Sequence, residues 1–159
     1  MPAVGKSTVG VLLAKRTSRD FVDTDVVIQQ GEGRRLRDII ADDGIDAFRA
    51  TEERYVLALA CKATVVATGG SVVYSEPAMK HLAALGTIVF LELPLEELRS
   101  RRPDFDAHGL VRRPGQDLAA LLAEREPLYR RWADVTVDCR GLGHDAVVDA
   151  VCTAMQAAV

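Results

Sequence analysis

Five residues close to the start of the chain have the types and the order that bind a phosphate group: Val4, Gly5, Lys6, Ser7 and Thr8. Phosphate-binding loops end in Gly-Lys followed by Ser or Thr, because backbone N–H groups wrap the phosphate oxygens, the lysine reaches the β and γ oxygens, and the hydroxyl ligates Mg²⁺. The complete motif begins with another glycine, which would fall one position before Met1. We therefore expect the chain to be short at its N-terminus and to lack the apolar strand that precedes such a loop.

The residues after this loop favour a helix. A helix over 6–17 that packs on a sheet is predicted by the spacing of the apolar residues Val9, Val11, Leu12 and Leu13. A helix that starts at Lys6 would direct its partial positive charge and its unpaired N–H groups at an anion. The alternative is a helix N-terminus that happens to carry a lysine.

Two carboxylates follow a predicted strand at 20–23. Asp23 and Asp25 are two positions apart, and side chains at this spacing on an extended backbone point the same way. Ligands of open parallel sheets bind at the carboxyl ends of the strands, so both carboxylates are candidates for a ligand site. The alternative is a turn or a helix cap, and either aspartate is placed to cap the helix that follows.

A pair of glycines follows the next predicted strand, at 63–67. Gly69 and Gly70 have no side chains, so a ligand can approach their backbone closely, and Ser71 comes directly after them. The alternative is a tight turn between a strand and a helix.

Arginines form local clusters in a chain that is acidic overall. The net charge of −3 and the pI of about 5.6 argue against a nucleic-acid partner. Local groups of arginine at 99–102, 112–113, 125 and 130–131 favour recognition of a small anion instead. The alternative is a charged, solvated helix face, which we favour for the last of these groups.

Arg49 precedes Glu52 by one helical turn. The carboxylate is close enough at this spacing to orient the guanidinium group toward a ligand. The alternative is an ion pair on the protein surface.

The elements that would position these residues alternate along the chain. Apolar runs and capping signals predict strands at 20–23, 63–67, 87–93 and 134–138, and helices at 6–17, 25–31, 34–42, 45–60, 76–85, from Pro94 onward, 116–132 and 144–157. Strands that alternate with helices imply an α/β fold whose parallel sheet is covered on both faces. With 159 residues, of which 48% are hydrophobic, we expect one globular domain, 1–159.

Two features bear on where the protein works. No apolar run reaches the roughly 18 residues that cross a membrane, and no signal peptide precedes the phosphate loop. The three cysteines have no metal-ligand spacing and no even count, which is typical of reduced thiols. We therefore expect a cytoplasmic protein without a membrane partner.

Four motifs in register resemble those of the shikimate kinases. They lie at 22–25 (Val-Asp-Thr-Asp), 46–52 (Asp-Ala-Phe-Arg-Ala-Thr-Glu), 68–70 (Thr-Gly-Gly) and 125–129 (Arg-Glu-Pro-Leu-Tyr), and the resemblance covers essentially the whole chain. It implies a P-loop NTPase fold of three layers, α/β/α, with a parallel sheet whose central first strand would be the missing one, and with a mobile lid at about 103–117. It also implies a monomer that uses ATP and Mg²⁺ to phosphorylate the 3-hydroxyl of shikimate.

The resemblance implies a role for each candidate residue. ATP would contact Val4, Gly5, Lys6, Ser7, Thr8, Arg102 and Arg113, and Mg²⁺ would be held by Ser7 and Asp23. Shikimate would contact Asp25, Arg49, Gly69, Gly70 and Arg125. Catalysis would fall to Asp25, Lys6 and Arg113, with Asp25 at the acceptor hydroxyl and ionised because of the cations near it. The two arginines of the acceptor site would match the two oxygens of a carboxylate.

The sequence departs from the family pattern at two places. Ser71 stands where the family usually has a third glycine, and the lid has Arg112-Arg113-Pro114-Gly115, where the family has Arg-Pro-Leu-Leu. Arg113 is the better match to the lid arginine, with Arg112 as the alternative. Because both regions surround the acceptor, a kinase of another small hydroxylated acid, such as gluconate or homoserine, stays open. A nucleotide-binding module without catalytic activity is a further alternative.

Overall fold

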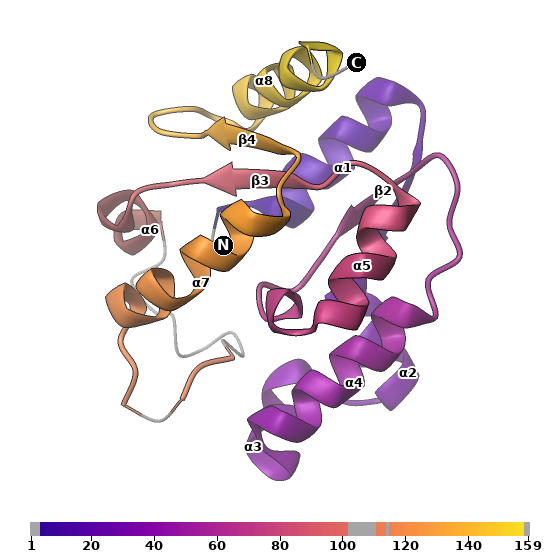
Figure 1. Ribbon diagram of the computed structural model, residues 1–159, viewed down its shortest axis with the longest axis vertical. Coiled ribbons are helices and arrows are strands. Elements are labelled where there is room, and N and C mark those ends of the chain that lie inside the picture. The colour runs from indigo at the N-terminus through magenta and orange to yellow at the C-terminus, as the bar shows by residue number, and fades with distance from the viewer. Residues whose placement is uncertain (1–3, 102–110, 114, 158–159) are drawn as a thin grey trace.

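The computed structural model describes residues 4–101, 111–113 and 115–157, which form alternating strands and helices (Figure 1). The strands in this part of the chain are β1 (Asp20–Asp23), β2 (Thr64–Ala67), β3 (Val89–Glu92) and β4 (Val135–Asp138). The helices are α1 (Lys6–Thr17), α2 (Thr24–Glu32), α3 (Leu36–Asp43), α4 (Ile45–Leu57), the 3₁₀ turn η1 (Val72–Tyr74), α5 (Glu76–Leu85), α6 (Leu95–Arg101), α7 (Leu118–Trp132) and α8 (His144–Ala157).

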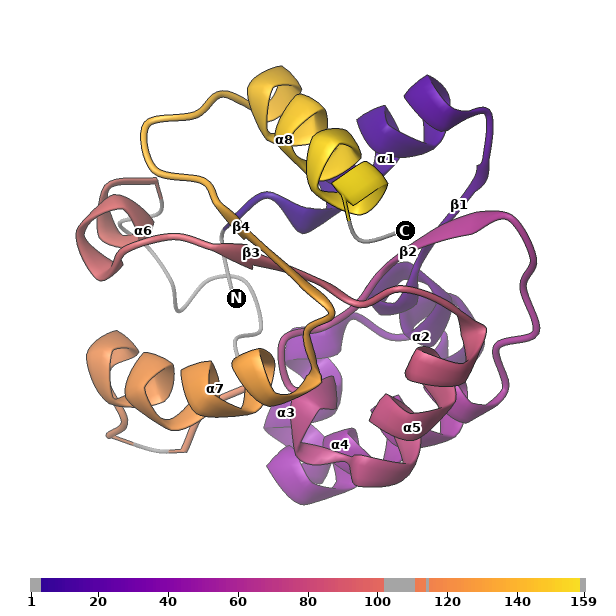
Figure 2. The ribbon, with the colours of Figure 1, turned by 45° about the horizontal axis from the view of Figure 1, so that its top comes forward.

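The strands lie in one layer between two layers of helices. Helices α1 and α8 cover one side, and α4, α5 and α7 lie on the other, as Figure 2 shows. Strand β1 pairs with β2, and β3 pairs with β4, both in parallel. The predicted α/β/α order with parallel strands is confirmed.

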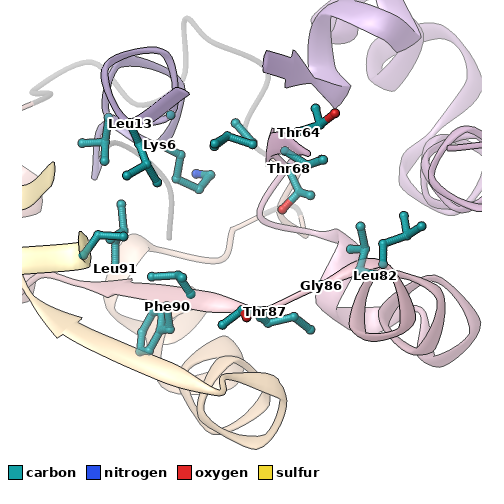
Figure 3. A pocket seen from close by; sticks show the side chains of 18 of the residues that line it. Lys6, Leu13, Thr64, Thr68, Leu82, Gly86, Thr87, Phe90 and Leu91 are labelled. Carbon is teal, nitrogen blue, oxygen red and sulfur yellow. The ribbon is translucent and has the colours of Figure 1, made fainter. Parts of the chain in front are cut away.

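The strand layer has a break between β2 and β3, because the described strands form two pairs and no continuous sheet. A cavity of about 680 Å³ lies at the break, lined by residues of α1, β2, β3, α5 and α8. In Figure 3, Lys6 and Leu13 of α1 lie on one side of this space and Leu91 of β3 on the other. The break falls where the sequence predicts a further, central strand.

Three apolar clusters hold the layers together. The largest joins α1, α7 and α8 to β3 and β4, and it includes Val4, which is buried just before the first helix. A second cluster, of Ile28, Ile39, Phe48 and Val111, packs α2, α3 and α4 against one another and against the segment before α7. A third joins α4, η1 and α5. The second cluster fixes α2 and α4, which carry Asp25 and Arg49, and the largest fixes α7, which carries Arg125.

Most predicted elements are confirmed, with changes at their ends. The strand predicted at 87–93 is shorter, Val89–Glu92, because its partner β4 offers only four residues to pair with. The helix predicted at 45–60 ends at Leu57. The turn η1 was not predicted, since three residues are too few to show a helical period. No helix in the described part of the chain is long and apolar enough to cross a membrane.

Candidate active site

The phosphate-loop residues lie at the N-terminus of α1. Gly5 precedes the helix with φ 93°, a left-handed conformation that favours glycine. A Cβ at this position would also stand 3.0 Å from Nε2 of His144, at the start of α8. The first-turn N–H groups of a helix with such a start are available to an anion, so this end of α1 suits a phosphate.

Ser7 and Asp23 meet at the end of β1. The Ser7 hydroxyl donates a hydrogen bond to Oδ2 of Asp23 at 2.5 Å, while Oδ1 of Asp23 accepts one from the backbone N–H of Asp25 at 3.0 Å. Asp23 therefore caps α2 with one oxygen, as one of the sequence alternatives predicted, and faces Ser7 with the other. A hydroxyl and a carboxylate side by side offer the hard oxygen ligands that Mg²⁺ prefers.

Asp25 lies in the first turn of α2, within the electric field of Lys6. Burial raises the pKa of Asp25 above its ordinary value, the Asp23 carboxylate raises it further, and Lys6 opposes both. Lys6 acts in the direction that the sequence predicts, since its charge favours the ionised carboxylate, but desolvation outweighs it in the net shift of the pKa. A carboxylate with a raised pKa is a stronger base.

Gly69 sits against two carboxylates. A Cβ there would stand 2.3 Å from Oε1 of Glu52 and 2.9 Å from Oδ1 of Asp25, so no side chain fits without displacing them. Its backbone N–H donates to Oγ1 of Thr24 at 3.2 Å, and the carbonyl of Gly70 accepts from the Tyr129 hydroxyl at 2.8 Å. The glycine turn is thus attached to α2 on one side and to α7 on the other.

Arg49 faces an aromatic ring. Its Cζ lies 4.1 Å from the centroid of the Tyr74 ring, and its buried Nε has no hydrogen-bond partner. The alternative of a surface ion pair with Glu52 is wrong, because Glu52 is buried and no salt bridge joins these two described residues. Ser71 donates a hydrogen bond to Oε2 of Glu52, and the charge of Arg49 lowers the pKa of that carboxyl without a hydrogen bond between the two.

Arg125 of α7 reaches the same tyrosine from another part of the chain. It is only 1% exposed, although arginine is almost never fully buried without partners. Its Nη2 donates to the carbonyl of Val111, and its Nε donates to the Tyr74 hydroxyl at 3.2 Å. Its Cζ is 5.2 Å from the Tyr74 ring centroid. The structure therefore brings Arg49 and Arg125 together, as the sequence predicts.

Glu52 is a buried carboxylate, 1% exposed, on which the charges of Asp25, Arg49 and Arg125 act. The Ser71 hydroxyl donates to its Oε2 at 2.6 Å, and its Oε1 has no partner. Burial is the main cause that raises the pKa of Glu52 to about 7, and the charge of Asp25 adds to it. The Ser71 hydrogen bond, Arg125 and Arg49 act in the opposite direction.

The lid segment enters the described structure only at its end. Arg113 is exposed, with Nη2 3.9 Å from Oε1 of Glu124, and Arg112 donates from Nη1 to the carbonyl of Gln116 at 2.7 Å. Arg102 and the larger part of the predicted lid, 103–117, lie outside the described residues. The choice between the two lid arginines stays a prediction.

The sequence assigns no role to four residues of the site: Thr24 and Tyr129, which lie within the family motifs, and Tyr74 and Glu124, which lie outside them. Tyr129 follows Arg125 by four residues, and the helical i, i+4 spacing is a signal that points to it. Tyr74 lies in a 3₁₀ turn, and no local pattern marks it.

A lysine and a hydroxyl at a helix N-terminus, a carboxylate at the end of the next strand, and two convergent arginines define a P-loop kinase of a small anionic molecule. The model of the family described as shikimate kinase matches residues 2–156. The chain belongs to this family.

Known proteins agree with this assignment. The chain is 40% identical over 151 residues to the shikimate kinase of Mycobacterium avium, covering 93% of this chain and 85% of the relative. It is also 40% identical over 139 residues to shikimate kinase 2 of Dickeya chrysanthemi, covering 84% and 80%. The solved structure of the Acinetobacter baumannii shikimate kinase in complex with shikimate has a TM-score of 0.89 at 30% identity, with 98% of this chain and 88% of that one covered.

Proposed function

We propose that this protein transfers the γ-phosphoryl group of ATP to the 3-hydroxyl of shikimate. The observation that carries the proposal is the convergence of Arg49 and Arg125 on Tyr74, close to the Asp25–Gly69 contact. Two planar guanidinium groups from different helices suit one small carboxylate. The Asp25 carboxylate suits an acceptor hydroxyl beside it.

In the proposed reaction the acceptor oxygen attacks the γ-phosphorus. A bond forms between the acceptor oxygen and phosphorus, and the bond from the γ-phosphorus to the bridging oxygen breaks, which releases ADP. Asp25 accepts the hydroxyl proton, helped by burial that raises its pKa. Lys6 neutralises charge on the transferred group, and the remaining phosphate-loop residues Val4, Gly5, Ser7 and Thr8 surround the other phosphates.

The donor set at the end of β1 fits Mg²⁺. In the described part of the chain no group of three or more His, Cys, Asp or Glu residues could hold a metal by itself. Ser7 and Asp23 supply two oxygens, which suits an ion that takes most of its other ligands from phosphates and water. Bound there, Mg²⁺ would reduce the negative charge of the phosphates during transfer.

The acceptor would be held by side chains and backbone together. Arg49 and Arg125 bind its carboxylate, and the turn at Gly69 and Gly70 lies against its ring. Arg113 and Arg102 belong to the nucleotide and to the transferred phosphoryl group in this proposal. We also propose a monomer, as the family resemblance implies.

A second acceptor, gluconate or homoserine, is favoured by one observation, Ser71 in place of a glycine. Its hydroxyl is 2.6 Å from Oε2 of Glu52, and the residue is 2% exposed. Because the hydroxyl is engaged with Glu52, we rank this alternative second.

A coupled assay of ADP release with shikimate, gluconate and homoserine tests the proposal. We expect kcat/KM for shikimate to exceed the other two by at least about a hundredfold, because a site built to pair with polar groups rejects acceptors that leave them unpaired. Turnover of gluconate or homoserine in preference to shikimate would identify the second function. ATP binding without turnover of any acceptor would identify an inactive nucleotide-binding module.

A further inference from the structure

Tyr74 lies at the end of η1, between the glycine turn and α5 in the sequence, and contacts Arg49 and Arg125, the two arginines proposed to clamp the acceptor carboxylate. It comes three residues after Ser71, in a segment that the sequence motifs do not include. Four contacts join it to three charged residues from two helices. No other described aromatic ring lies within cation–π distance of both Arg49 and Arg125.

The ring holds Arg49. The guanidinium carbon is 4.1 Å from the ring centroid, while Nε of Arg49 is buried without a hydrogen-bond partner. A guanidinium group stacked on an aromatic face keeps its N–H edge available for an anion. The ring of Tyr74 thus orients Arg49 without using up the donors that a carboxylate would need.

The hydroxyl holds Arg125. It accepts a hydrogen bond from Nε of Arg125 at 3.2 Å and donates one to Oε1 of Glu124 at 2.7 Å. Because the hydroxyl both accepts and donates, its position is fixed from two sides. Glu124 in turn accepts a hydrogen bond from Nε2 of Gln116 at 2.7 Å, so the hydroxyl is anchored to the segment before α7 as well.

We propose that Tyr74 is a positioning residue that sets the separation of Arg49 and Arg125, with its ring against one guanidinium and its hydroxyl bonded to the other. The inference rests on the proposed function, in which these arginines bind the acceptor carboxylate. A rigid spacing between the two groups selects a planar carboxylate of matching size, and it lowers the cost of ordering them when the acceptor binds.

Tyr74→Phe tests the inference, because it keeps the ring and removes the hydroxyl. Of the two hydrogen bonds that are lost, the one from Arg125 acts on the acceptor site, so we expect KM for shikimate to rise about three- to tenfold, while KM for ATP stays within twofold of the wild-type value. Tyr74→Leu also removes the ring and should raise KM for shikimate further. If the leucine variant fails to fold, the phenylalanine variant alone carries the test.

Shikimate methyl ester separates positioning from a general structural effect. The ester keeps the ring hydroxyls but lacks the negative charge that the arginines recognise. We expect Tyr74→Phe to reduce kcat/KM for the acid and to leave kcat/KM for the ester unchanged. A loosened fold would lower both values in equal proportion, and that result would overturn the proposal.

Tyr55→Phe is a matched control on α4. The Tyr55 hydroxyl donates to Oε1 of Glu32 at 2.9 Å, and Arg54 stacks on its ring with Cζ 4.9 Å from the centroid. The substitution removes the same kind of hydrogen bond beside the same kind of stacked arginine. We expect both KM values to stay within twofold of wild type, and a rise equal to that of Tyr74→Phe would overturn the proposal.

The two hypotheses fail in different ways. If the wild-type protein does not phosphorylate shikimate, the proposed function is wrong. If the wild-type protein is active and Tyr74→Phe leaves KM for shikimate unchanged, only the role of Tyr74 is wrong. As a last check, Tyr74→Phe should change KM by less than twofold in an Arg125→Lys background, because a positioning residue has no effect once its target is removed.

Discussion

The two halves of the site are built differently. In the phosphate half, the Ser7 and Thr8 side chains are exposed at the start of α1, and the cavity between β2 and β3 lies next to Lys6. In the acceptor half, Glu52 and Arg125 are 1% exposed and already held by protein groups. The phosphate half is therefore open to a ligand, although Ser7 already pairs with Asp23, whereas the acceptor half is buried and organised before the acceptor arrives.

This difference follows from the chemistry of each ligand. A triphosphate brings several charges and can order flexible groups around itself, with backbone N–H groups and a lysine as its main contacts. A small acid brings one carboxylate and a few hydroxyls, so its selection depends on groups that are held in place beforehand. Substitutions in one half should therefore leave the ligand of the other half bound as before.

Asp25→Asn should abolish phosphoryl transfer between the two halves while each half still binds its ligand. The carboxylate lies beside Gly69 on the acceptor side and in the field of Lys6 on the phosphate side. We expect kcat to fall by roughly 10²–10⁴-fold, since an amide cannot accept the proton, while the Kd for ATP measured by calorimetry stays near the wild-type value. A variant that keeps more than about a tenth of the activity would remove Asp25 from the mechanism.

Arg49→Lys should affect the acceptor half alone. The lysine keeps the charge but loses the planar fork, so we expect KM for shikimate to rise at least about tenfold and KM for ATP to stay unchanged. Arg54→Lys is the matched control, because Arg54 stacks on Tyr55 of the same helix. An increase of KM for ATP with no change for shikimate would place Arg49 in the phosphate half and contradict its proposed role in binding the acceptor carboxylate.

Glu52→Gln should show how far the buried carboxyl of the acceptor half lowers the free energy of unfolding when it ionises. The carboxyl ionises at about 7 in the folded protein and near 4.5 when unfolded, so the folded state binds the proton more tightly. Stability therefore falls as pH rises from 4.5 to 7, by up to about 3 kcal/mol. The amide cannot ionise, so we expect the variant to be more stable than wild type at pH 8.

Denaturant unfolding at pH 5 and pH 8 measures this effect. The loss of stability between the two pH values should be smaller in Glu52→Gln than in wild type. Glu53→Gln is the control, because Glu53 lies on the same helix and accepts a serine hydrogen bond, from Ser75 at 2.6 Å. An unchanged pH dependence in Glu52→Gln would mean that Glu52 is not the group responsible.

The sequence predicts the phosphate half better than the acceptor half, for a physical reason. The loop, α1 and the Asp23–Asp25 pair are contiguous or nearly so, and their types and spacing carry the signal. Asp23 was predicted as a metal ligand or a cap, and the structure confirms the cap while placing Ser7 beside its other oxygen. The relative positions of residues this close in sequence can be predicted from their types and spacing.

The acceptor half depends on contacts between distant segments. Arg49 and Arg125 could be named from the family motifs, but the tyrosine between them could not, because Tyr74 lies in an aperiodic turn. The helical spacing of Arg49 and Glu52 also suggested that these two side chains interact directly, whereas in the folded protein Glu52 accepts a hydrogen bond from Ser71.

Ser71→Gly should give the smallest effect and test how completely the acceptor half is preorganised. The substitution restores the family residue and removes the hydroxyl that donates to Oε2 of Glu52 at 2.6 Å. That hydrogen bond favours the charged carboxylate, so its loss should raise the pKa of Glu52 still further and cost about 1 kcal/mol at alkaline pH, where the group is ionised. Below pH 5, where Glu52 is protonated in both proteins, unfolding should show a smaller difference. A difference that is independent of pH would mean that the serine acts through backbone conformation and not through its hydroxyl.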